Sequence, residues 1–159
     1  ITERWEHGYM LGYYNDGEGP GMDATVYSPI VDTKFINNTP HHLLIENYYN
    51  QEFEALTFKM YSTSMGREVE KSEPVFSDVV PAPTEDVWEY DPDLPPGTVE
   101  QIDWAVEGAR VAVDRVVRNA DGQEIIDETV VSNYIPYPNV YHYGPGVEPY
   151  DYSLVPDES

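Results

Sequence analysis

The sequence contains no cysteine among its 159 residues. This absence excludes disulfides, thiolate metal ligands and a thiol nucleophile within the chain. No apolar run approaches the roughly 18 residues that a membrane-spanning helix needs, and no signal peptide is recognisable. Since the chain begins with Ile1 and not with Met, we expect it to be the back end of a larger protein.

Basic residues are also scarce, with 8 Lys and Arg against 30 Asp and Glu, a net charge of −22 and a pI near 4.1. Nucleic acid is excluded as a partner because phosphate binding relies on basic stripes. Anionic membrane surfaces are disfavoured for the same reason. The acidity favours solubility, with a self-repulsion that salt or divalent cations relieve.

What is present predicts a folded protein. Hydrophobic residues make up 40% and aromatic residues 13% of the chain, including 14 Tyr, which is well above the composition of disordered chains. The length fits one ordinary domain or two small ones. We favour two, each with a modest core that depends on its neighbour.

The first unit, residues 1–71, is predicted to be β-rich. Short segments between Ala24 and Tyr61 are rich in Val, Ile, Thr, Tyr and Phe, and residues 56–61 alternate between apolar and other side chains as a half-exposed strand does. The turn residues Asn37 to Pro40 predict a hairpin from about Asp32 to Tyr49.

Residues 72–83 carry three prolines and no clear period, which predicts a semi-rigid linker between the units. Residues 84–146 form the second predicted unit, again of strands, and residues 147–159 a polar acidic tail. A hairpin joining residues 110–119 to 123–133 is predicted by Asp121-Gly122, because glycine supplies the positive φ of a tight turn.

Residues Gly21 to Ile45, which read GMDATVYSPIVDTKFINNTPHHLLI, resemble the closing segment of the VanW domain of bacterial envelope proteins. The resemblance covers roughly Ile1 to Ser62, and the stretch ITERWEHGYMLGYY is similar to the ERRxHS segment of that family. It implies an upstream cysteine that would lie before Ile1. As a hypothesis, His7 would deprotonate that cysteine and Asp23 would orient the imidazole. The alternative is that Asp23 caps a turn into a strand.

Residues Glu89 to Gly144 resemble a wall-associated domain named for its five glycines, the G-five domain. The match is carried by Asp91–Thr98, Gly108, Asn119–Ile125 and Gly144, whereas Arg110 and Val111 stand where a further glycine is usual. The resemblance implies an elongated antiparallel β fold with little core, an extracytoplasmic location at the bacterial cell surface or wall, and binding of N-acetylglucosamine-type glycans or spacing from the wall.

Aromatic side chains can stack on the apolar faces of sugar rings. The candidate glycan-binding residues in the second unit are Trp88, Tyr90, Trp104, Tyr141 and Tyr143. The alternative is that these rings cover the sheet in place of a core.

No cofactor and no metal site is predicted. His41 and His42 are adjacent, so on a strand they point to opposite faces and do not share one ion. Calcium would suit the charge, with Asp91 and Asp93 or Asp121 and Glu124 as ligands, but neither pair completes a loop motif. The glycine run Gly17, Gly19 and Gly21 lacks the Lys and the helix of a phosphate loop.

Taken together, the sequence predicts a mainly β, extracytoplasmic module that attaches to peptidoglycan or holds a partner at a distance from it. Two other functions stay open. One is part of a peptidoglycan-acting cysteine enzyme whose nucleophile lies upstream. The other is a structural module that forms a homodimer through exposed β edges.

Overall fold

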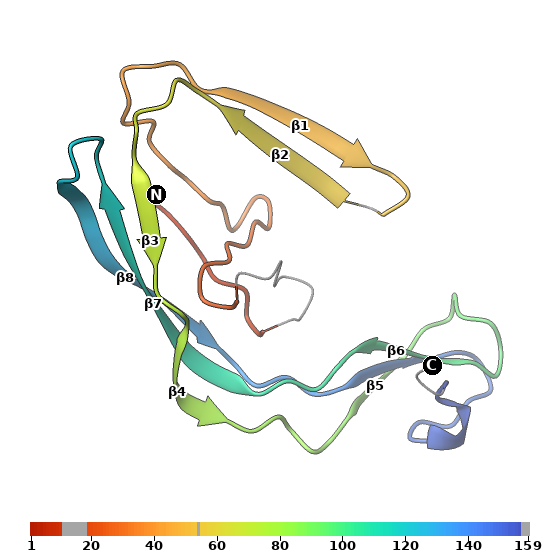
Figure 1. The fold of residues 1–159 in the computed structure, drawn as a ribbon. Coiled ribbons are helices and arrows are strands. Elements are labelled where there is room, and N and C mark those ends of the chain that lie inside the picture. Colours follow the sequence, from red (N-terminus) through yellow and green to blue (C-terminus); the bar gives the residue numbers. More distant parts are fainter. Residues whose placement is uncertain (11–18, 54, 157–159) are drawn as a thin grey trace.

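The computed structural model describes residues 1–10, 19–53 and 55–156. The described residues are mainly β, which confirms the predicted fold class, and they form an elongated, bent body (Figure 1). The elements are β1 (Leu44–Asn50), β2 (Ala55–Tyr61), β3 (Glu68–Lys71), β4 (Val75–Val80), β5 (Val87–Tyr90), β6 (Val99–Asp103), β7 (Gly108–Arg118), β8 (Glu124–Tyr134), β9 (Val140–Tyr143) and the 3₁₀ turn η2 (Tyr152–Leu154). The described residues contain no helix long and apolar enough to cross a membrane.

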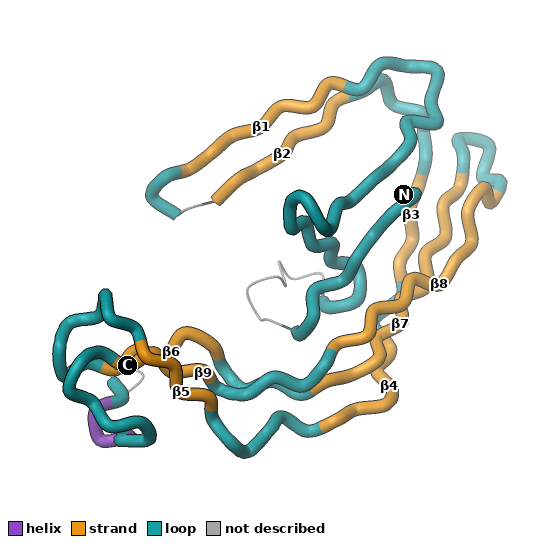
Figure 2. Tube along the Cα trace, turned by 180° about the vertical axis from the view of Figure 1, so that it is seen from behind, coloured by secondary structure: helices purple, strands orange, loops and turns teal. Residues whose placement is uncertain are grey.

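Strands β1 and β2 form an antiparallel hairpin in which Leu44 pairs with Tyr61 and Asn50 with Ala55. Figures 1 and 2 show this hairpin projecting from the top of β3, apart from the other strands. The hairpin expected from Asp32 to Tyr49 is therefore wrong. The Asn37 side chain does accept from the Thr39 amide within the expected turn, but Lys34 pairs with Glu3 at the start of the chain.

The central sheet is built on β7, which pairs with β3 and β4 on one edge and with β8 along the other. The β7–β8 hairpin confirms the prediction from Asp121-Gly122. Gly122 has a φ of +77°, and the Asn119 side chain accepts from the amides of Asp121 and Gln123. The long strands carry most of the buried hydrophobic residues: Ala109, Val111, Val113, Val117 and Tyr134.

The residues predicted to be a linker contain a strand. Val75 and Phe76 of β4 pair with Ala112 and Val111 of β7. The three prolines lie on either side of Val75–Val80 and not inside it, so none of them removes an amide from the middle of the strand. The predicted semi-rigid linker is therefore replaced by an edge strand over these six residues.

The third sheet has the order β5-β9-β6. Its β6–β9 pair is antiparallel as predicted, whereas β5 and β9 run parallel. Val99, Tyr141 and Val147 form a small core here, with Trp88, Tyr143 and Val155 packed against it. Part of the predicted tail, residues 147–156, therefore docks on this sheet, while residues 157–159 lie outside the described part of the chain.

Candidate functional site

The candidate site lies where the N-terminal segment crosses the β7–β8 hairpin, and its centre is Asp23. The Nδ1 atom of His7 lies 2.8 Å from Asp23 Oδ2, and the His7 backbone amide donates to the same oxygen at 2.8 Å. The Tyr134 hydroxyl, from the end of β8, donates to Asp23 Oδ1. The structure thus brings the two sequence-predicted residues, His7 and Asp23, into direct contact and adds Tyr134.

These contacts set the ionisation of Asp23 and Tyr134. Burial by itself would raise the pKa of Asp23, but hydrogen bonds from the His7 amide, the Tyr134 hydroxyl and the His7 ring together hold that pKa below its ordinary value. Burial, and then the hydrogen bond to Asp23, raise the pKa of Tyr134 to about 12. At neutral pH the pair is therefore a carboxylate and a neutral phenol.

Arg4 joins the N-terminal segment to β8. Its guanidinium donates to the carbonyl of Asp23 at 2.7 Å, to the carbonyl of Gly21 at 3.0 Å and to the hydroxyl of Ser132 at 2.5 Å. Ser132 is fully buried and donates in turn to the Gly21 carbonyl at 3.0 Å. Since the charged guanidinium strengthens the three bonds that Arg4 donates, the network fixes the segment on the sheet.

Gly21 lies directly on the sheet surface. Its φ is +109°, and a Cβ atom there would approach Val111 Cγ1 to 2.9 Å and Val113 Cγ2 to 3.0 Å. Its amide donates to the Tyr134 hydroxyl at 2.8 Å. A residue without a side chain is therefore needed at this position.

The His7–Asp23 pair has the geometry of a base and the group that orients it. When Asp23 accepts the proton of Nδ1, Nε2 becomes the nitrogen that can accept a proton from a substrate or nucleophile. Asp23 also accepts a hydrogen bond from Tyr134. This bond holds the N-terminal segment on β8, so Asp23 has a structural role as well. A catalytic role for His7 and Asp23 remains a proposal, because the chain has no cysteine to supply the nucleophile.

Four of the five predicted glycan-binding aromatics are in ring contact, since Tyr90 also lies 5.6 Å from Tyr143. Trp88 stacks on Tyr141 with ring centroids 4.9 Å apart, and Tyr143 lies 6.3 Å from Trp88. Tyr141 is buried in the small core. Tyr90 is 56% and Trp104 is 52% exposed, so these two residues present the larger surface to solvent.

No group of three His, Cys, Asp or Glu residues within the described ranges is arranged to hold a metal ion. Asp91 accepts from the amide of Asp93 at 2.9 Å within its turn. His142 faces two carboxylates, Glu89 at 3.4 Å and Asp91 at 3.6 Å. Of the glycine run, Gly17 lies outside the described residues, Gly19 lies just before a turn, and Gly21 lies in that turn, against Val111 and Val113 of β7.

Sequence reasoning did not identify Arg4, Ser132 and Tyr134 as parts of the site. Tyr134 lies 111 residues from Asp23 along the chain, and Ser132 lies 128 residues from Arg4. One signal was available: Ser132 is a polar residue at a position of β8 whose partner on β7 is the buried Val111. A polar side chain on a buried face needs a partner.

Solved structures that are similar to part of this chain include the following two. One, titled "IgA1 Protease G5 domain structure", shows 22% identity, covers 49% of this chain and 90% of its own, and gives a TM-score of 0.26. The other, titled "Crystal structure of HP0197-G5", shows 18% identity, covers 49% of this chain and 97% of its own, and gives a TM-score of 0.22. No curated protein showed a significant match to the chain.

The N-terminal part of the chain matches a family model. The match spans residues 1–61, and the model is described as "VanW like protein". The matched range includes the residues that the N-terminal segment contributes to the site: Arg4, His7, Gly21 and Asp23. The resemblance noted in the sequence is thus confirmed over these residues, which we call the VanW-like segment.

Proposed function

We propose that the chain is a non-catalytic, extracytoplasmic module that attaches to bacterial peptidoglycan or holds a partner domain at a distance from it. The observation that carries this proposal is that the residues of the candidate site join the N-terminal segment to the central sheet. Arg4, Gly21 and Asp23 join the VanW-like segment to Ser132 and Tyr134 of β8. The two parts of the chain therefore behave as one extended β body.

Thin β architecture supports the spacing role. All nine buried hydrophobic residues in the described part of the chain lie between Val99 and Val147, and six of them form two small clusters of three. A compact chain of this length would have a radius of gyration of about 15 Å. Small-angle scattering should give a clearly larger value, and a value near that of a compact domain would contradict the spacing role.

Attachment is tested by retention on purified peptidoglycan. Tyr90 and Trp104 offer the exposed rings of the second unit, so we expect Tyr90→Ala combined with Trp104→Ala to reduce retention. Tyr27→Ala is the matched control, because Tyr27 is 67% exposed on the VanW-like segment. If the unaltered chain is not retained on peptidoglycan, the attachment role is wrong and only the spacing role remains.

A second function is favoured by one specific contact, the 2.8 Å approach of His7 Nδ1 to Asp23 Oδ2. In a longer protein that supplies a cysteine, this pair would act as base and orienting group on peptidoglycan. The test is peptidoglycan turnover by that protein with His7→Gln, compared with His42→Gln on the exposed loop before β1. Equal activity of both variants would eliminate the enzymatic role.

A further inference from the structure

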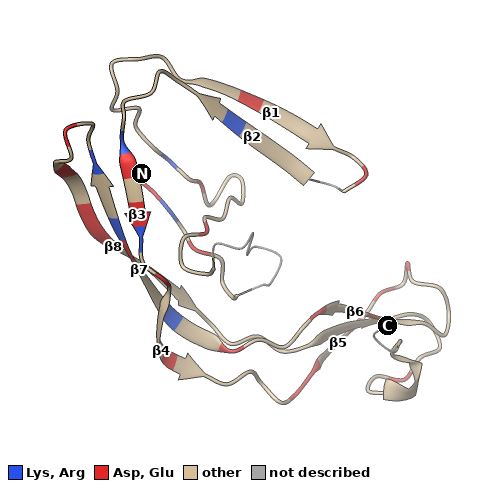
Figure 3. Cartoon of the chain, in the orientation of Figure 1, with Lys and Arg blue, Asp and Glu red and all other residues tan. Residues whose placement is uncertain are grey.

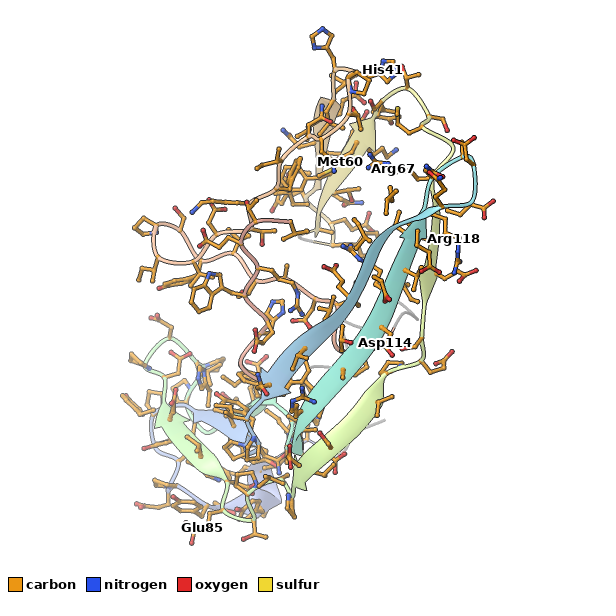
Figure 4. The ribbon with its side chains drawn as sticks, turned by 90° about the vertical axis from the view of Figure 1, so that its left-hand side faces the viewer. His41, Met60, Arg67, Glu85, Asp114 and Arg118 are labelled. Atoms are coloured by element: carbon orange, nitrogen blue, oxygen red, sulfur yellow. The ribbon has the colours of Figure 1, made fainter. Side chains whose placement is uncertain are left out.

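A narrow junction joins the central sheet to the third sheet. Three connections cross it, which are residues 81–86, 104–107 and 135–139. Figure 2 draws all three as loops, and Figure 4 shows Glu85, in the first connection, beyond the end of the central sheet that carries Asp114 and Arg118. Small interfaces between units of one chain usually allow relative motion, so a fixed angle between these two sheets needs a cause.

The connection over residues 135–139 has few amides with which to bind its neighbours. Its two prolines have no amide hydrogen to donate. Tyr137 forms an isolated bridge with Val106, in which each amide donates to the carbonyl of the other at 2.9 Å. The Ile135 amide donates at 2.8 Å to the carbonyl of Gly8. The VanW-like segment therefore follows β8 beyond its last residue and into the junction.

Tyr9 extends this contact with its side chain. Its ring lies parallel to the ring of Tyr137, with centroids 3.9 Å apart and planes that differ by 5°. Met10, the next residue, packs against the buried cluster of the central sheet that contains Tyr134. The stack therefore links a chain that is anchored on the central sheet to the connection that leads to the third sheet.

We propose that the VanW-like segment fixes the angle between the central sheet and the third sheet through the stack of Tyr9 on Tyr137. Stacked rings lose contact when they slide or tilt, so the stack opposes rotation at the junction. Without it, the junction has fewer packed contacts, and such regions move more freely. This proposal rests on the spacing role, because a fixed angle sets how far the third sheet is held from the VanW-like segment.

Spin labels measure this angle, because a chain without cysteine is labelled only where cysteines are introduced. The junction pair spans the two sheets, with Asp127→Cys on β8 and Asp93→Cys in the loop between β5 and β6, both at exposed positions. The sheet pair lies within the central sheet, with Asp127→Cys and Val75→Cys, since Val75 is 62% exposed on β4. Pulsed electron paramagnetic resonance of the whole chain gives the distribution of distances for each pair.

Tyr9→Ala should widen the distribution of the junction pair about twofold, because the junction loses its packed ring, and it should leave the sheet pair narrow. Tyr137→Ala should have the same effect, since it removes the other ring of the stack. Tyr9→Phe keeps the ring and should keep the junction pair narrow. Tyr27→Ala is the matched control, because Tyr27 is 67% exposed in the same segment, and it should leave both pairs unchanged.

Three results would overturn the proposal. The junction pair could be as narrow in Tyr9→Ala and Tyr137→Ala as in the unaltered chain. The sheet pair could widen as much as the junction pair, in which case the stack holds the central sheet and not the angle. Tyr27→Ala could widen the junction pair equally. A compact radius of gyration would contradict the spacing role itself, whereas an unchanged junction pair in an extended chain would overturn only the role of the stack.

Discussion

At the scale of single residues, the Tyr134 hydroxyl holds the VanW-like segment from two directions. It accepts from the Gly21 amide and donates to the Asp23 carboxylate. Tyr134→Phe leaves both groups without this partner in a region that is largely closed to water. We expect a loss of about 1–3 kcal/mol in the free energy of unfolding, measured by denaturant titration. Tyr27→Phe, at an exposed position, should change it by less than about 0.5 kcal/mol.

The hydrogen bond between Tyr134 and Asp23 should also make the stability depend on pH. The pKa of Tyr134 is raised to about 12 in the folded protein, so its contribution is complete below the unfolded value of about 10 and is lost as the pH rises from there to 12. This loss corresponds to about 2–3 kcal/mol. The free energy of unfolding, measured against pH, should fall less between about pH 10 and 12 for Tyr134→Phe than for the unaltered chain. Equal losses in the two proteins would show that Tyr134 does not cause the alkaline loss.

Asp23 should make the protein lose stability as the pH falls, because its hydrogen bonds lower its pKa. Its contribution is present above the unfolded pKa of about 3.9 and is lost as the pH falls through the lower folded value. The Asp23→Asn variant should therefore be less stable than the unaltered chain at pH 6, with the difference shrinking below pH 4. A difference that is constant over this range would show that Asp23 does not act through its charge.

Gly21 tests how closely the segment approaches the sheet. In Gly21→Ala the added Cβ would lie 2.9 Å from Val111 Cγ1, at a φ of +109°. Gly146 also has a positive φ, +82°, but nothing lies within 4 Å of its Cβ position. Gly146→Ala should cost about 1 kcal/mol from backbone strain alone. Gly21→Ala should lower the free energy of unfolding clearly more than Gly146→Ala does. Equal losses would contradict the close approach of Gly21 to Val111.

At the scale of elements, β4 differs most from its predicted role as a linker. Its backbone is engaged with β7, and proteases prefer exposed segments that can be released locally. Chymotrypsin should therefore cut after Phe53, which is 73% exposed in the turn after β1, before it cuts after Phe76 of β4. Mass spectrometry of timed samples would show the order, and early cleavage after Phe76 would restore the linker interpretation.

The elements that the sequence predicts correctly are those with local causes. The β7–β8 hairpin follows from Asp121-Gly122, whose turn geometry is fixed by neighbouring residues. The Asp32 to Tyr49 hairpin is wrong because Lys34 finds its partner in Glu3, 31 residues away. Likewise, a shared site for His7 and Asp23 could be proposed from a family pattern, but Tyr134 could not, since only the folded sheet brings it to Asp23.

At the scale of the whole molecule, the excess of acidic side chains is spread over the bent β body. Figure 3 shows Asp and Glu positions on the central sheet, on the β1–β2 hairpin and around the third sheet. Basic side chains form ion pairs with nearby carboxylates. Arg118 of β7, for example, donates to Glu70 of β3 at 2.6 Å and to Glu124 of β8 at 2.8 Å, which links the three strands. Such exposed pairs contribute only about 0–1 kcal/mol each.

Salt therefore has two opposing effects, and their sizes decide the outcome. Screening weakens the exposed pairs slightly, but it also relieves repulsion in a chain with 30 acidic and 8 basic residues. The repulsion involves many more groups, so the melting temperature should rise between about 10 and 300 mM NaCl, over which the Debye length falls from about 30 Å to below 8 Å.

Calcium separates general screening from a specific site. Asp91 and Asp93, or Asp121 and Glu124, are the carboxylate pairs that the sequence offers, but no group of three His, Cys, Asp or Glu in the described residues is arranged to hold a metal ion. Calcium binding sites in proteins take six to eight oxygen ligands. CaCl₂ and MgCl₂ at equal concentration should therefore raise the melting temperature equally, because both act as screening ions. An additional shift with calcium that is lost in Asp91→Asn or in Asp121→Asn would instead locate a specific site at that pair.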